Sequence, residues 1–182
     1  TLFRSVGYCC CQMLVEIRNA ATTSTSTSTT TSEHEVVLKI IQNYGQALQW
    51  GHANIFQSLP RLLTLWFEAS LSFLPGSKLA KDLSNCMRTL VRNLPIYQWI
   101  TALPQLISRV SHSSSTVTKL LHEVLLKMLK SCPSQVMWAL IGALDTVNVN
   151  RRTRISDVLK AAKSSSGALR AQVGDCMALV TK

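Results

Sequence analysis

The sequence predicts an all-α protein built from stacked antiparallel helix pairs, a HEAT- or TPR-like α-solenoid. Apolar residues recur at intervals of three and four along most of the 182-residue chain, which is the pattern of helices that bury one face. Clusters of Pro, Gly and Ser interrupt this pattern at spacings typical of paired-helix repeats. We find no convincing strand, because the period-two alternation typical of strands is absent.

Three segments are expected. Residues 1–20 have the pattern of the end of an upstream helix, and residues 34–182 carry the helical repeats. Between them, residues 21–33 include eleven consecutive Ser or Thr residues, which offer no apolar side chain to bury. We therefore expect a disordered linker or a loop insertion at 21–33. The chain opens without an initiator Met, and we interpret it as a fragment of a longer protein.

The repeats begin with three predicted helices. The first has its apolar stripe from Val36 to Leu48 and ends before Gly51. The second starts its stripe at Ile55 and stops near the turn signal "LPGS" at Leu74–Ser77. The third carries apolar residues from Leu79 to Leu94.

Prolines and serines mark the next helices. Pro95 suits the first turn of a helix that extends to Val110. After "SHSSS", Ser115 is the expected N-cap of the fifth helix, and Pro133 starts the sixth.

A loop, "DTVNVN", is predicted at 145–150. Two weaker amphipathic helices, roughly 151–163 and 167–181, complete the chain.

Two similar stretches place a proline within a helical run. "SLPRLLTLW" contains Pro60 and "ALPQLISRV" contains Pro104, about 44 residues later, a period in the range of HEAT repeats. We expect Ser58 to cap a helix that starts just before Pro60, and a kink near 100–104 in the helix that Pro95 opens. The apolar residues at matching positions should form a shared packing stripe: Leu59, Leu62 and Leu63, with Leu103, Leu106 and Ile107.

The formal net charge of +10 favours two interpretations. One is an acidic partner or nucleic acid, with the densest cluster at Arg151, Arg152 and Arg154 as a phosphate contact. The other, which we prefer, is that the charge is balanced elsewhere in a longer protein and that this cluster is a solvated helix start. No apolar run is long enough to span a membrane.

The sequence offers no catalytic, cofactor-binding or metal-binding residue. His34, His52, His112 and His122 lack metal-ligand spacing and are expected to be solvated or packed. The six cysteines form no disulfide or zinc pattern, which favours a reducing compartment. The four tryptophans fall on apolar stripes, so we expect them in the core: Trp50, Trp66, Trp99 and Trp138.

Three segments resemble one family in matching order. They are "NYGQALQWGHANIFQSLPRLLTLWFE", "YQWITALPQLISRVSHSSSTV" and "CPSQVMWALIGAL" followed by "VNRRTRISDVLKAA". Together they resemble the C-terminal part of the FAT region of phosphatidylinositol 3-kinase-related protein kinases, most closely the ATR-type checkpoint kinases. The resemblance covers residues 36–182, and the Ser/Thr run has no expected counterpart in the family.

The resemblance implies a non-catalytic scaffold that clamps and regulates a kinase domain in cis. The parent would be a nuclear serine/threonine kinase of the DNA-damage and replication checkpoint that uses ATP with Mg or Mn. An ATRIP-type subunit and homodimerisation are also implied. The kinase residues would lie downstream, so no cofactor is expected in this segment and the chain alone should be inactive.

An alternative from another class is a free-standing basic helical-repeat scaffold that binds nucleic acid or protein. We consider direct nucleic-acid binding unlikely, since the basic residues are mostly dispersed. An enzyme within this chain ranks last, because no site supports it.

Overall fold

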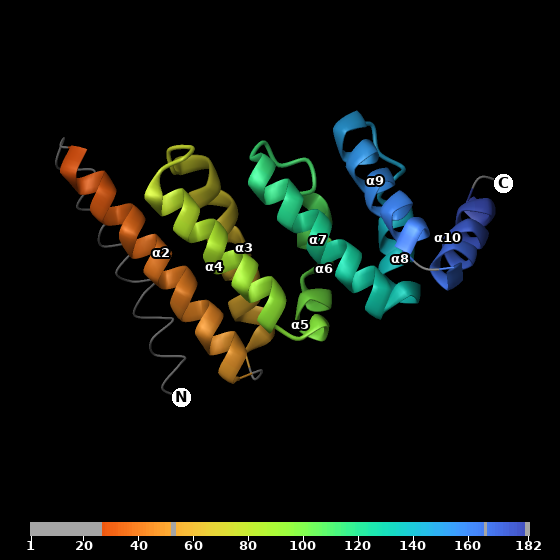
Figure 1. Cartoon of the computed structure of the whole chain (residues 1–182), viewed down its shortest axis with the longest axis horizontal. Helices are drawn as coiled ribbons and strands as arrows, with labels where there is room; N and C mark the ends of the chain where they lie inside the picture. The colour runs from red at the N-terminus through yellow and green to blue at the C-terminus, as the bar shows by residue number, and fades with distance from the viewer. Residues whose placement is uncertain (1–26, 52–53, 166, 181–182) are drawn as a thin grey trace. The chain divides into compact units, whose positions relative to one another are not determined.

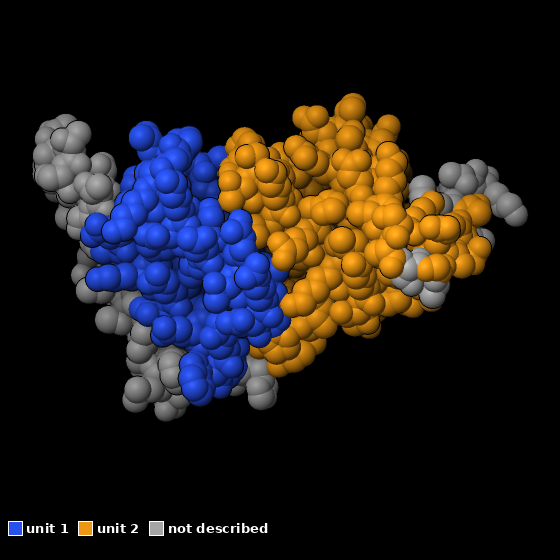
Figure 2. Space-filling view, viewed as in Figure 1, with its two compact units in different colours: residues 1–94 blue, residues 95–182 orange. Residues whose placement is uncertain are grey.

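The computed structural model describes residues 27–51, 54–165 and 167–180, and within these ranges it contains nine α-helices and no strand (Figure 1). The predicted all-α class is confirmed. The helices belong to two compact units, Thr1–Leu94 and Pro95–Lys182, shown in blue and orange in Figure 2.

The first unit contains α2 (Thr27–Trp50), α3 (Ile55–Ser72) and α4 (Lys78–Asn93). Successive helices run in opposite directions, and α2 packs against both α3 and α4 (Figure 1). The core between them is aliphatic and aromatic, and its completely buried members include Ile41, Leu59, Leu62, Leu63 and Met87. The predicted stripe around Pro60 is therefore a buried packing surface.

Helix α2 begins earlier than expected. The structure places Thr27–Glu33, which we predicted to be linker, in the first turns of the helix. A helix that is already nucleated by the buried stripe extends at little cost, because Ser and Thr are only modestly unfavourable in helices. The linker prediction is wrong for these seven residues, and residues 21–26, like the helix expected at 1–20, lie outside the described residues.

Helix α3 also begins before its predicted start. Asn54 is the N-cap and Ile55 the first residue, so Pro60 lies inside the helix and Ser58 is not a cap. Burial of Ile55 is the physical reason, since an isoleucine side chain gains about 1.5 to 3 kcal/mol on burial. This gain is comparable to the roughly 3 kcal/mol that an interior proline costs.

The turn between α3 and α4 is confirmed. Gly76 has φ +83, a left-handed conformation that glycine adopts without strain. Ser77 then caps α4, because its side-chain oxygen accepts a hydrogen bond from the backbone N–H of Ala80 at 3.1 Å.

Gly45 permits the close approach of α2 to α4. A Cβ atom at this position would lie 2.6 Å from Cδ2 of Leu90, a side chain that is itself buried in the core. Only a residue without a side chain fits this crossing without movement of Leu90.

We expect Gly45→Ala to lower the free energy of unfolding by about 1 kcal/mol, since overpacking of up to about 3 kcal/mol outweighs a helix-propensity gain of about 1 kcal/mol. Gly174→Ala is the matched control, because nothing lies within 4 Å of a Cβ there. It should stabilise the protein by up to about 1 kcal/mol. Urea unfolding of both variants measures the difference, and stabilisation by Gly45→Ala would show that the crossing is looser than described.

The second unit contains six helices within the described residues. They are α5 (Ile96–Thr101), α6 (Leu103–Ser108), α7 (Ser115–Ser131), α8 (Pro133–Gly142), α9 (Val149–Ser165) and α10 (Gly167–Val180). Helix α7 packs against α5, α8 and α9, and α10 packs against α8 and α9. Helix pairs thus build both units, as expected for HEAT repeats.

Proline positions explain how the second unit begins. Pro95 is the N-cap of α5, and the helical run breaks at Ala102, which confirms the predicted kink. Pro104 then occupies the first turn of α6, where its missing N–H costs nothing. Pro133 opens α8 as predicted.

The start of α7 differs from prediction by one residue. Ser114, not Ser115, is the N-cap, and its side chain makes no capping bond. The ring Nδ1 of His112 instead accepts a hydrogen bond from the backbone N–H of Ser114 at 3.1 Å.

A candidate binding pocket between two helices

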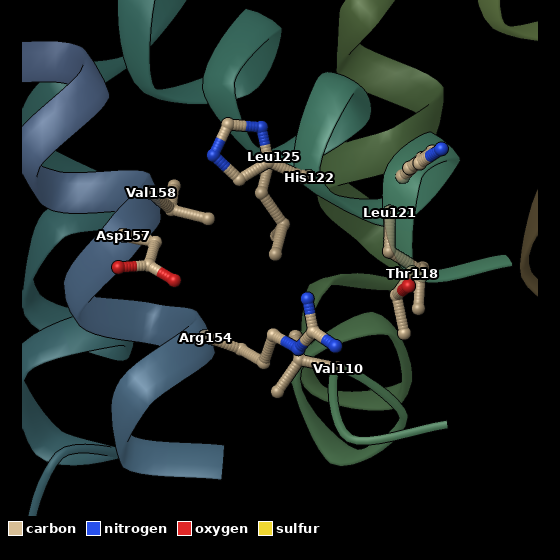
Figure 3. Close-up of a pocket in the computed structure, with 9 residues that line it drawn as sticks. Val110, Thr118, Leu121, His122, Leu125, Arg154, Asp157 and Val158 are labelled. Atoms are coloured by element: carbon tan, nitrogen blue, oxygen red, sulfur yellow. The ribbon is translucent and has the colours of Figure 1, made fainter. Parts of the chain in front are cut away.

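A pocket of about 190 Å³ lies in the second unit, between α7 and α9 (Figure 3). Its lining combines aliphatic and charged side chains: Val110, Thr118, Lys119, Leu121, His122, Leu125, Arg154, Asp157 and Val158. It is the candidate functional site of the part of the chain that the structure describes.

Helical spacing places these side chains together. On α7, Thr118, Leu121, His122 and Leu125 follow one face at intervals of three and four residues. On α9, Arg154, Asp157 and Val158 repeat the same spacing. The contact between α7 and α9 then brings the two faces together.

The walls of the pocket are apolar. Val110, Leu121, Leu125 and Val158 are all buried in the core and line the pocket at the same time. The hydroxyl of Thr118 donates to the carbonyl of Ser115 at 2.9 Å. These walls can hold an apolar group away from water.

Charged groups stand at the rim. Lys119 comes from α7, while Arg154 and Asp157 come from α9, and all three are exposed. Figure 3 shows the guanidinium of Arg154 reaching into the space between the helices, with the ring of His122 on the opposite side. The pocket lining therefore includes two cationic side chains and one anionic side chain.

The three arginines of the basic cluster noted in the sequence, Arg151, Arg152 and Arg154, make different contacts. Arg152 holds the loop before α9, since its Nε and Nη2 donate to the carbonyls of Leu144 and Thr146 at 3.3 and 2.7 Å. The backbone N–H of Arg151 donates to Oδ1 of Asn148 at 3.1 Å, which caps the start of α9. Only Arg154 lines the pocket.

The histidines also have separate roles. His34 lies against the ring of Phe73 with centroids 4.7 Å apart, and His122 lines the pocket. His52 lies outside the described residues. No group of three or more potential metal ligands occurs in the described ranges, and the expectation of no catalytic or metal residue stays a prediction.

Two tryptophans contradict the core prediction. Trp66 and Trp99 are buried, but Trp50 is 82% exposed and Trp138 is 52% exposed. Trp50 is the last residue of α2, and Trp138 is not among the buried residues of α8. Apolar periodicity predicts which residues share one face of a helix, but it does not predict whether another helix covers each of those residues.

The described cysteines are free thiols. Cys86, Cys132 and Cys176 are partly buried, and burial raises the pKa of the Cys86 thiol.

Among the described residues, no helix combines the length and the apolar character that a membrane span requires.

Sequence reasoning missed Thr118, Lys119 and Asp157, and it treated His122 as an isolated side chain. A signal was present, because Thr118 and His122 interrupt an otherwise apolar stripe at a spacing of four residues. Only the packing of α7 against α9 shows that residues of α9 lie opposite Thr118 and His122.

Packed helix pairs of this kind are typical of helical-repeat proteins. A family of such repeats, described as "Serine/threonine-protein kinase ATR-like, HEAT repeats", matches residues 82–180. The chain belongs to this family.

The chain is also similar to individual protein kinases. The chain is 36% identical over 135 residues to the serine/threonine-protein kinase ATR of Oryza sativa subsp. indica, and 34% identical over 128 residues to that of Arabidopsis thaliana. It is 28% identical over 156 residues to protein kinase rad3 of Schizosaccharomyces pombe. These matches cover 70%, 66% and 76% of this chain but only 5%, 5% and 6% of the relatives.

Proposed function

We propose that this chain is a non-catalytic scaffold segment of an ATR-type checkpoint kinase, from the C-terminal part of its FAT region. The family match to ATR-like HEAT repeats over 82–180, which spans α5 to α10 and most of α4, supports the ATR-type part of the proposal. The placement in the FAT region rests on the sequence resemblance alone. The parent would phosphorylate Ser or Thr before Gln in the nucleus, with ATP and a divalent metal. Its partners would include an ATRIP-type subunit and a second copy of the kinase.

The scaffold would clamp the kinase domain in cis and transmit changes to it. Packed helix pairs support such a role, because close-packed interiors deform little and move as linked rigid units. The second unit fits this description, with completely or almost completely buried side chains on α6, α7, α8 and α9. A displacement of one pair is therefore passed to its neighbours.

The coding sequence that follows this segment tests the assignment first. We expect a kinase catalytic loop within about 300 residues, and a stop codon directly after the segment would contradict the proposal. The second test is phosphotransfer to a Ser-Gln peptide. The 182-residue chain alone should show none, and the full-length protein should show activity.

A further inference from the structure

We propose that the pocket between α7 and α9 binds an acidic peptide segment of a separate partner protein. One bulky apolar side chain of the peptide enters the pocket, and a neighbouring carboxylate pairs with Lys119 and Arg154. This inference goes beyond the scaffold role and does not rest on it.

The size and walls of the pocket select the apolar part of the ligand. A volume of about 190 Å³ is more than ten times the roughly 10 to 15 Å³ that a cavity needs to hold one water molecule, and it suits a single large side chain. Four buried aliphatic side chains form the walls: Val110, Leu121, Leu125 and Val158. A leucine or phenylalanine of a partner would replace water against these walls.

The rim selects the polar part. Lys119 and Arg154 both line the pocket, come from different helices and are exposed, so a carboxylate at the rim would meet positive charge with little desolvation. Arg154 is free of the loop contacts that hold Arg152, and Figure 3 shows its guanidinium turned toward the pocket. The net charge of +10 adds long-range attraction for an acidic partner.

Asp157 distinguishes a peptide from a simple anion. Its carboxylate lines the same pocket and would repel a phosphate or a nucleic-acid backbone. A peptide carries backbone N–H donors as well as acidic side chains, so it can use Asp157 and the two cations together. The combination of mixed charge and aliphatic walls therefore fits a peptide best.

The test measures the binding of short fluorescein-labelled peptides to the 182-residue chain by fluorescence anisotropy. Each peptide has a central Leu flanked by Asp and Glu. Arg154→Glu should weaken binding by about tenfold or more, since it places like charges together. Lys160→Glu is the matched control, an equal charge change at an exposed position of α9 outside the pocket lining, and should change binding by less than about twofold. Circular dichroism confirms that both variants remain folded.

Three further ligands sharpen the result. A peptide with Ser in place of the central Leu should bind more weakly, and a peptide flanked by Lys should bind Arg154→Glu better than the unchanged chain. Equal loss from both glutamate variants, or equal competition by inorganic phosphate, would show general anion attraction and overturn the proposal. Binding to the isolated chain but not to the full-length protein would place a segment of the parent in the pocket, which overturns a separate partner.

Discussion

Trp66→Ala is expected to lower the free energy of unfolding of the first unit by about 3 to 5 kcal/mol, the usual cost of removing a buried aromatic side chain. Trp66 is 2% exposed, and its ring stacks on Phe67 with centroids 4.9 Å apart. Whole domains are stable by only about 5 to 15 kcal/mol, so the variant should lie close to the unfolding threshold.

Trp50→Ala is the control for this prediction. It removes the same side chain from an 82% exposed position in the same unit and should change stability by less than about 0.5 kcal/mol. Urea unfolding followed by far-UV circular dichroism compares the two variants. Similar midpoints would show that the burial of Trp66 is not as described.

The second large effect has the opposite sign: Pro60→Ala should stabilise the first unit by about 1 to 2 kcal/mol. Pro60 lies inside α3 and cannot donate a hydrogen bond to the carbonyl of Phe56, which an alanine at this position can do. An interior proline costs roughly 3 kcal/mol, and the loss of its restraint on the unfolded chain offsets up to about 1 kcal/mol of the gain.

Pro133→Ala separates this effect from proline removal in general. Pro133 is in the first turn of α8, where no backbone N–H is needed, so its loss should leave stability unchanged or slightly lower. Thermal or urea unfolding of both variants gives the comparison. Destabilisation by Pro60→Ala would mean that α3 needs the local geometry that the proline imposes.

Periodicity predicted the helices well because burial of an apolar face dominates their stability. The stripe of α3 and the break at Ala102 both followed from the residues alone. Helix starts were less predictable, since competing caps differ by only about 1 kcal/mol and burial of one apolar side chain outweighs that difference. Helix α3 starts at Ile55, which is buried, and not at Ser58.

The candidate site was much less predictable than the fold. The sequence indicates Arg154 only as part of a basic cluster and His122 only as a solvated or packed side chain. The two line one pocket only because α7 packs against α9. Such contacts join segments distant in the chain, and no local pattern specifies them. The same limit applies to Trp138, whose exposure depends on which helices cover α8.

The most direct test of the scaffold role is the ratio of activated to basal kinase activity in the full-length protein, with Leu140→Ala against Gln135→Ala. Both residues lie on α8, but Leu140 is completely buried and Gln135 is exposed. If this segment transmits regulation, Leu140→Ala should change the ratio by at least about fivefold per mole of folded protein, the lower range of measured allosteric coupling. Gln135→Ala should leave it unchanged. An unaltered ratio in a demonstrably loosened Leu140→Ala protein would contradict the account.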